Sequence, residues 1–387
     1  MSSPYKIGAV INQRYKLEKE IGRGGMESVI YLATDQSITN DRYLEMKRKK
    51  VAIKIVCKKD FTDDDDREEK WNKLRDETVT GLRATSMPNI VHTYDVIYDD
   101  QNECIIIVME FIDGQSLRQI LDQHGYLSVK EGLYIILKVV EAINSLHRLQ
   151  HKIIHRDLKP ENIMITKDFT EIKIIDFGIS SVVNIHEHKA LTSEDTLYGT
   201  YAYMSPDIYR MAQYVDSKKR KGEVVNDHAE MITEQFDFHS IGVILYETIT
   251  GTKPFWYHTY DEGKEAKNII YLCEKYDIYP MNKLDANIPN GIENIIFRCL
   301  ASKPNDRKYR YQNAQAIIDD LLRVKNNFKA AFGEKLIKPV NKRVYSSKLI
   351  FNLDRERNTQ KFYEQFWFIG LLLLVTAIVV IITVVLI

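Results

Sequence analysis

The spacing of apolar residues along the chain changes near residue 113. Before that point, apolar residues stand in short runs rich in β-branched and aromatic side chains, separated by glycines or polar residues. Such runs are typical of β-strands, and they predict four strands, at residues 15–22, 27–35, 51–57 and 103–110. The highly charged stretch between the third and fourth strands, residues 67–83, predicts a helix.

After residue 113 the apolar residues recur every three or four positions, which is the period of a helix with one buried face. This pattern predicts helices at residues 129–149, 238–250, 292–301 and 313–324. A small sheet-rich lobe therefore precedes a larger helical lobe. We expect the hinge between the two lobes at residues 110–114.

The final segment, residues 366–387, contains 22 residues and no charge. At about 1.5 Å per residue, a helix of this length spans roughly 33 Å, enough for the ~30 Å hydrocarbon core of a bilayer. Tyr363 and Trp367 stand where an interfacial aromatic belt would lie. We therefore predict one transmembrane helix that contacts membrane lipid and, because the sequence goes no further, no folded domain beyond it.

The residues before this segment form a basic linker. Residues 331–365 hold eight Lys or Arg and four Asp or Glu residues, a net charge of +4. The positive-inside rule places such a linker in the cytoplasm, and the N-terminus shows no signal-peptide pattern. We expect a single-pass protein of the cell membrane with its other residues in the cytoplasm. Two interpretations of the linker charges stay open, a solvated linker and a contact with anionic lipid.

The overall composition is that of a globular protein. Of 387 residues 44% are hydrophobic, and 54 basic residues balance 54 acidic ones. This composition excludes a disordered polyelectrolyte, a collagen-like repeat and a generally basic nucleic-acid binder, so we expect no nucleic-acid partner. The zero net charge is itself a sum, because residues 1–330 keep 46 basic and 50 acidic residues and carry −4.

The four cysteines lie far apart in the sequence, at Cys57, Cys104, Cys273 and Cys299. None belongs to a CxxC pair, and none has a histidine at metal-ligand spacing. We therefore expect neither a disulfide framework nor a zinc module, and a reducing compartment.

Two features of the first three predicted strands are suited to phosphate groups. Gly22, Gly24 and Gly25 follow the first strand, where a backbone without side chains can approach phosphate oxygens closely. On its own this pattern fits a hairpin turn equally well. Lys54 lies in the third strand, in the sequence VAIK, and in a nucleotide site it would bind the α- and β-phosphates.

The strongest motif is HRDLKPEN at residues 155–162, followed after thirteen residues by DFG at residues 176–178. Asp157 can accept a hydroxyl proton, and Lys159 can neutralise a phosphoryl group in transfer. Asn162 and Asp176 offer the oxygen ligands that Mg²⁺ prefers. Together with the glycines and Lys54, these motifs indicate phosphoryl transfer.

With these motifs in this order, the chain resembles the eukaryotic-like (Hanks-type) protein kinases over about residues 13–325. The sequences IVME and HRDLKPENIMI are most similar to those of bacterial membrane-bound serine/threonine kinases. The resemblance implies an α+β, bilobal protein kinase fold with an N-lobe at residues 13–111 and a C-lobe at residues 112–325. The basic juxtamembrane linker, residues 326–365, and the transmembrane helix, residues 366–387, complete the predicted organisation.

The resemblance also implies a set of ligands and site residues. Lys54 would pair with a glutamate of the following helix, for which Glu77 is the candidate although Glu69 lies nearby. The nucleotide would be ATP, bound with Mg²⁺ or with Mn²⁺ in its place. The implied ATP-binding residues are Ile21, Gly22, Gly24, Val29, Ala52, Lys54, Glu110 and Ile112.

Further implied roles concern the catalytic loop and the activation segment. Asp237 would brace the catalytic loop, and Arg156 would bind a phosphorylated activation segment. The end of that segment, GTYAYMSPD, includes Thr200 near the protein substrate and Asp207 where glutamate is usual. Arg307 would pair with Asp207.

We expect phosphorylation within the activation segment itself. Polar residues between DFG and SPD are the candidate acceptors, at Thr192, Ser193 and Thr196. They would be phosphorylated by a second copy of the chain at the membrane, which requires self-association. The alternative is that this polar stretch is simply a loop.

The sequence thus predicts a membrane-anchored serine/threonine protein kinase that transfers the γ-phosphoryl group of ATP to proteins. The alternatives are a membrane-tethered pseudokinase scaffold and a small-molecule phosphotransferase. Glu27, which stands where the third glycine of GxGxxG is expected, and Asp207 favour the pseudokinase weakly. The complete set of catalytic residues opposes it. Insertions at residues 35–50 and 212–234 have no assigned role.

Overall fold

The computed structural model describes residues 3–23, 28–37, 50–60, 67–84, 87–176, 200–221, 233–255, 273 and 278–338. Several predictions made above fall on residues outside this set: those for Gly24, Glu27, Thr192, Ser193, Thr196 and the transmembrane helix at 366–387. Among the described residues, no helix is both long and apolar enough to cross a membrane.

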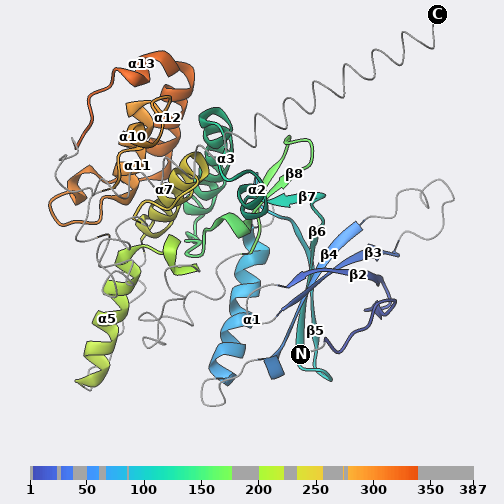
Figure 1. Cartoon of the computed structure of the whole chain (residues 1–387). Helices are drawn as coiled ribbons and strands as arrows, with labels where there is room; N and C mark the ends of the chain where they lie inside the picture. The colour runs from blue at the N-terminus through green and yellow to red at the C-terminus, as the bar shows by residue number, and fades with distance from the viewer. Residues whose placement is uncertain are drawn as a thin grey trace, which may run out of the picture.

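The N-lobe is built on a six-stranded antiparallel sheet in the order β1-β2-β3-β4-β6-β5 (Figure 1). Its strands are β1 (Val10–Ile11), β2 (Tyr15–Arg23), β3 (Val29–Asp35), β4 (Lys50–Cys57), β5 (Thr93–Asp99) and β6 (Cys104–Glu110). The four predicted strands are thereby confirmed, whereas β1 and β5 were not predicted. Strand β5, TYDVIYD, contains two aspartates, a residue type depleted in strands, so it lacks the uninterrupted apolar run that predicted the others.

Alternation along β4 divides its side chains between two hydrophobic clusters. Val51, Ile53 and Ile55 pack on the face that also buries Tyr15 and Leu17 of β2. Val56 packs on the opposite face, with Leu74 of helix α1 (Arg67–Ala84). Because side chains two positions apart share a face, Lys54 lies on the side covered by α1.

The C-lobe packs around one central helix, α7 (Gln235–Thr250), in which every residue after Gln235 is buried. Helices α3 (Val129–His147) and α11 (Asn290–Leu300) pack against α7, and α12 (Ala314–Asn326) packs against α3 and α11. Gly242 lets α7 and α11 approach closely, because a Cβ atom there would lie 2.6 Å from the Cβ of Cys299. The four predicted helices of this lobe are confirmed within a few residues.

Several further elements complete the lobe. They are α2 (Leu117–His124), α5 (Pro206–Arg220), α10 (Met281–Leu284), α13 (Phe328–Phe332) and the three-stranded sheet β7 (Gly114–Ser116), β8 (Ile163–Thr166) and β9 (Ile172–Ile174). Ser116 and Ser128 each form a capping box that fixes where α2 and α3 begin. Helix α5 occupies the first part of the predicted insertion at 212–234.

Strand β9 joins the two lobes. Ile174 exchanges backbone hydrogen bonds with the segment before β5, from Val91 N to Ile174 O (2.9 Å) and from Ile174 N to Asn89 O (2.9 Å). Beside it, Lys173 forms an ion pair with Glu110 at the end of β6, with Nζ 2.7 Å from both carboxylate oxygens. The residues that follow β9 therefore have a fixed position relative to the N-lobe sheet.

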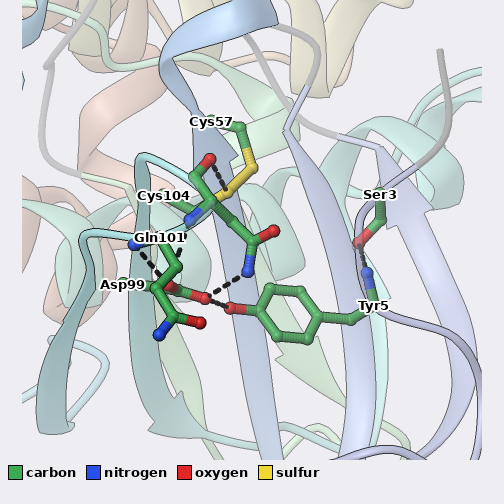
Figure 2. Close-up of a disulfide and its surroundings, with 7 residues drawn as sticks. Ser3, Tyr5, Cys57, Asp99, Gln101 and Cys104 are labelled. Atoms are coloured by element: carbon green, nitrogen blue, oxygen red, sulfur yellow. Dashed lines mark hydrogen bonds between the residues drawn. A yellow bond between two sulfur atoms is a disulfide. The ribbon is translucent and has the colours of Figure 1, made fainter.

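The expectation that the chain holds no disulfide is wrong, because Cys57 and Cys104 are joined by one (Figure 2). The two cysteines are 47 residues apart in sequence. The antiparallel pairing of β4 with β6, however, sets Cys57 directly opposite Cys104. Spacing along the chain gives no sign of this contact. The other two cysteines, Cys273 and Cys299, are free and buried.

The disulfide lies beside a turn that the N-terminal segment holds in place. In the turn between β5 and β6, Asp99 accepts hydrogen bonds from Gln101 N (3.0 Å) and Asn102 Nδ2 (2.7 Å). The hydroxyl of Tyr5 donates to the same carboxylate, as Figure 2 shows. Residues before β1 are thus tied to the edge strand of the sheet.

The disulfide leads to a direct prediction about thiol counts. In denaturant without reductant, a thiol reagent should titrate two groups per chain, Cys273 and Cys299, and four after reduction. Because the bond closes a 47-residue loop, its reduction should lower the free energy of unfolding by about 2–4 kcal/mol. In a Cys57→Ala/Cys104→Ala variant, reductant should leave the melting temperature unchanged. Four reactive thiols before reduction would contradict the assignment.

Candidate active site

The loop that carries the HRDLKPEN motif follows α3 and is hydrogen-bonded to one buried carboxylate. Asp237, in the first turn of α7, accepts hydrogen bonds from His155 N (2.9 Å) and Arg156 N (2.8 Å). Its Oδ2 also lies 2.8 Å from Nε2 of His147. Burial alone would raise the pKa of Asp237, but the His147 hydrogen bond and charge bring that pKa below its ordinary value. The carboxylate is therefore ionised.

The backbone of this loop is strained where Asp237 holds it. Arg156 has a φ of +67°, a left-handed conformation that costs energy for a residue with a side chain. Next to it, Asp157 N donates to His155 O (2.9 Å). The two hydrogen bonds from the loop to Asp237 thus keep a turn that the chain would not favour alone.

Asp157, Lys159 and Asn162 form one hydrogen-bonded group. Asn162 Nδ2 donates to the backbone oxygen of Asp157 (2.8 Å) and to its Oδ2 (3.2 Å), and Lys159 Nζ lies 3.0 Å from the same Oδ2. Asp157 and Asn162 are both buried. The short 3₁₀ helix η3 (Pro160–Asn162), with proline at its first position, sets the direction of the asparagine.

Asp176 meets the N-lobe through Lys54. Lys54 Nζ lies 2.7 Å from Oδ1 of Asp176, and the lysine is buried. Burial would raise the pKa of Asp176, but the charge and hydrogen bond of Lys54 lower it below its ordinary value. The φ of Asp176 is +54°, which Asp tolerates better than most residues. Ile175 N also donates to Asn162 O (2.9 Å), which joins this segment to the catalytic loop.

The predicted partner of Lys54, Glu77, belongs to α1, but its side chain lies outside the described residues. In the part of the chain that the structure describes, Lys54 pairs with Asp176.

The other predicted ATP-binding residues that the structure describes lie in β2, β3, β4 and β6 and just after β6. Ile21 and Gly22 are in β2, Val29 begins β3, and Ala52 pairs in register with Met109 at the end of β6. Val29, Ala52 and Ile112 are buried, whereas Ile21 is exposed. The backbone nitrogen of Glu110 donates to His92 O (2.8 Å), so this N–H is already used within the protein.

The residues before Asp207 are anchored by a buried network that the sequence did not predict. In η6 (Thr200–Tyr203), the hydroxyl of Tyr203 donates to Glu247 of α7 (2.5 Å). Glu247 also accepts a hydrogen bond from Arg118 of α2 (2.9 Å). The GTYAYMSPD pattern marks the tyrosine, but no local signal marks Glu247 or Arg118. The side chain of Thr200 lies outside the described residues.

Asp207 does lie near Arg307, but the arginine is not its nearest partner. Arg307 Nη2 lies 3.4 Å from Oδ1, whereas Arg310 Nη1 lies 2.6 Å from Oδ2 and Arg210 Nη1 lies 2.5 Å from Oδ1. The expected pairing is therefore shared among three arginines. Arg310, which comes three residues after the arginine of the family motif, was not predicted.

The arrangement fits a divalent cation. Lys54 binds only one oxygen of Asp176, and Asn162 uses its amide nitrogen toward Asp157. Within the described residues, Oδ2 of Asp176 and Oδ1 of Asn162 accept no hydrogen bond. One carboxylate and one amide oxygen are hard ligands of the kind that Mg²⁺ takes.

Comparison with known proteins agrees with this geometry. The model of a family described as "Protein kinase domain" matches residues 15–317. Two relatives, both named "Putative serine/threonine-protein kinase", come from Mycoplasma pneumoniae (35% identical) and Mycoplasma genitalium (36% identical). Each alignment covers 89% of this chain and 87% of the relative. The serine/threonine-protein kinase PrkC of Bacillus subtilis is 30% identical over 81% of this chain and 41% of its own length.

Among solved structures, the crystal structure of Rad53 1-466 in complex with AMP-PNP superposes with a TM-score of 0.55. The alignment covers 79% of this chain and 64% of that chain at 22% identity. At this identity the match demonstrates a shared fold.

Proposed function

Because the chain belongs to the protein kinase family and is a serine/threonine protein kinase, we propose that it transfers the γ-phosphoryl group of ATP to serine and threonine hydroxyls of proteins. The observation that carries this proposal is the continuous set of contacts from Lys54 in the N-lobe to Asp157 in the C-lobe. Lys54 pairs with Asp176, the preceding residue Ile175 donates to Asn162, and Asn162 donates to Asp157.

Each residue of this set has a defined task in the reaction. Asp157 orients the acceptor hydroxyl and takes its proton as the new O–P bond forms and the bond to the ADP oxygen breaks. Lys159, already within 3.0 Å of that carboxylate, stabilises negative charge on the phosphoryl group in transfer. Lys54 would exchange its contact with Asp176 for the phosphates of ATP.

Mg²⁺, held by Asn162 and Asp176, would supply positive charge to the phosphate oxygens when bound. The protein's own contribution is positional, because the transition state of phosphoryl transfer is loose and is stabilised by charge and alignment. The strained turn at Arg156 and the buried group around Asp157 provide that alignment.

We also propose that one copy of the chain phosphorylates another. Thr192, Ser193 and Thr196 are the candidate acceptors, and they stand between the Asp176 and Asp207 motifs. Arg156 adjoins Asp157 in the catalytic loop, and a guanidinium there suits a phosphorylated segment. Two copies held at one membrane would meet at high effective concentration.

Membrane attachment completes the proposal. The uncharged run at residues 366–387 would be the anchor, with the catalytic residues on the cytoplasmic side. The chain leaves the C-lobe along a defined route: Asn290 and Asn294 bind backbone oxygens of Glu334 (2.9 Å) and Lys335 (3.1 Å). Lys338 then pairs with Asp306 (2.6 Å). Burial of Cys57 and Cys104 would slow reduction of their disulfide in that compartment, because thiol exchange requires access to the sulfur atoms.

Loss of Lys54 or Asp176 should abolish most of the transfer. With radiolabelled ATP and Mg²⁺, Lys54→Ala and Asp176→Ala should each lower turnover on a basic protein acceptor by more than about a hundredfold. Lys50→Ala is the matched control on the same strand, because that lysine pairs with Glu18 at the sheet surface. The turnover of the control should stay within about twofold of wild type.

Transfer between copies is tested with a second acceptor, the Asp157→Asn variant. Wild type should label this variant within the variant's activation segment.

Two outcomes of this assay would contradict the proposal. Wild type without transfer would indicate the pseudokinase scaffold, and normal turnover by Lys54→Ala would refute the site. Labelling of the basic protein but not of the Asp157→Asn chain would refute only phosphorylation between copies.

Disruption of the apolar run should release the chain from membranes. The wild-type chain should sediment with membranes and resist alkaline carbonate extraction. Leu373→Arg/Val379→Arg should move it to the supernatant, because each arginine at the bilayer centre costs about 3 kcal/mol. Lys342→Gln/Arg343→Gln, which changes only the linker, should stay with the membranes after extraction. Wild type in the supernatant would contradict the anchor.

A further inference from the structure

The aromatic ring of Tyr203 is fixed in place at the end of the activation segment. Its hydroxyl donates to Glu247 and its backbone oxygen accepts a hydrogen bond from Ser240 Oγ (2.9 Å), and both partners belong to α7. Tyr203 is 3% exposed. Because one buried helix holds both its hydroxyl and its backbone, a side chain that packs on the ring also has a defined position.

The amine of Lys253 lies over this ring. Lys253 Nζ is 5.3 Å from the centroid of the Tyr203 ring, within the distance of a cation–π interaction. The turn that carries the lysine is ordered as well, because Gly251 ends α7 in a left-handed conformation and Thr250 Oγ1 donates to Thr252 O (3.0 Å). Lys253 is half-buried, so a partner from outside the chain can still approach it.

In the part of the chain that the structure describes, the charge of Lys253 is not balanced by an acid. No described carboxylate lies within ion-pair distance of its amine. The neighbouring cation, Arg118, is paired twice, since Nη1 lies 2.9 Å from Glu247 and Nε lies 2.8 Å from Asp122. Lys253 therefore offers a positive charge to an anionic group of a ligand, which Arg118 does not.

Tyr203 lies beside the catalytic loop as well as beside Lys253. Burial raises the pKa of Tyr203, and the charges of Glu247 and Glu161 raise it further, so Glu161 is close to the ring. Glu161 belongs to η3 and comes four residues after Asp157. An acceptor whose hydroxyl reaches Asp157 thus passes the end of the activation segment, and side chains next to that hydroxyl come within reach of Lys253.

The candidate acceptors of the activation segment stand beside acids in the sequence. Within TSEDT, residues 192–196, Glu194 and Asp195 lie between Ser193 and Thr196. Each of the three hydroxyl residues in this stretch therefore has a carboxylate within two positions. When one copy phosphorylates another, these acids would meet Lys253 of the phosphorylating copy, and opposite charges favour that encounter.

We propose that Lys253 is a specificity-determining residue, and that this kinase selects serine and threonine acceptors with an acidic residue within a few positions of the hydroxyl. The inference rests on the proposed transfer to proteins and names the class of acceptor. It concerns the residues next to the hydroxyl, not the net charge of the whole acceptor. Because Lys253 belongs to the turn after α7 and not to the ATP-binding strands, its loss should leave the KM for ATP unchanged.

The test compares peptides as acceptors for the full-length chain. One peptide has the sequence of residues 188–199, and a second carries Glu194→Gln and Asp195→Asn, which remove both charges and keep the shapes. Wild type should phosphorylate the acidic peptide with a kcat/KM about tenfold higher. Lys253→Met, which keeps an apolar chain over the ring, should reduce this ratio to less than about twofold.

Charge reversal makes the test specific. Lys253→Glu should prefer a third peptide, with Glu194→Lys and Asp195→Lys, over the acidic one. The matched control is Lys329→Glu, an equal change of net charge at an exposed position of α13, which lies at the other end of the C-lobe from α5 (Figure 1). This control should keep the wild-type ratio. Each ratio compares two peptides in one enzyme preparation, so it does not depend on the fraction of folded enzyme.

Several results would overturn this inference alone. They are equal kcat/KM values of wild type for the acidic and uncharged peptides, an unchanged preference in Lys253→Glu, and an equal shift in Lys329→Glu. Labelling of the basic protein but of no peptide would have the same meaning. Wild type that labels no acceptor at all would refute the proposed function, and the inference with it.

Discussion

The catalytic geometry of this protein depends on the buried carboxylate of Asp237. Its two oxygens accept hydrogen bonds from the backbone N–H groups of His155 and Arg156, and one of them is also hydrogen-bonded to a ring nitrogen of His147. Holding Arg156 in a left-handed conformation costs on the order of 1–3 kcal/mol. Hydrogen bonds to a buried charge offset that cost, since each is worth about 1.5–3 kcal/mol. Asp157 is the next residue after Arg156, so the contacts with Asp237 also fix the position of Asp157.

From Asp157 toward the N-lobe, negatively and positively charged side chains alternate. Asp157 is bounded by Lys159 and by the amide of Asn162, and Asp176 is bounded by Lys54 of the N-lobe. Strand β9 leads into Asp176 while it is bonded to the N-lobe through its own backbone and the Lys173–Glu110 ion pair. The helices of the C-lobe thus position the catalytic loop, and the sheet of the N-lobe positions Lys54.

Much of this could be predicted from the sequence, because the signals concerned are local. Four strands followed from short apolar runs, four helices from the spacing of apolar residues and a fifth helix from a charged stretch. The catalytic motifs were each contiguous in the sequence. Contacts between distant segments were the part that could not be predicted. Cys57 meets Cys104 only through strand pairing, Glu247 meets Tyr203 only through packing, and Arg310 reaches Asp207 across the lobe. Strand β5 was missed because two aspartates interrupt its apolar residues.

The most direct test of the account is the turnover of an Asp237→Asn variant. Asparagine has nearly the same shape, but in either orientation its amide nitrogen must face the backbone N–H of His155 or of Arg156, so one hydrogen bond is replaced by a repulsive contact. The account predicts a chain that remains folded by circular dichroism well below its melting temperature and transfers phosphate about a hundredfold more slowly. Near wild-type turnover in the folded variant would contradict it.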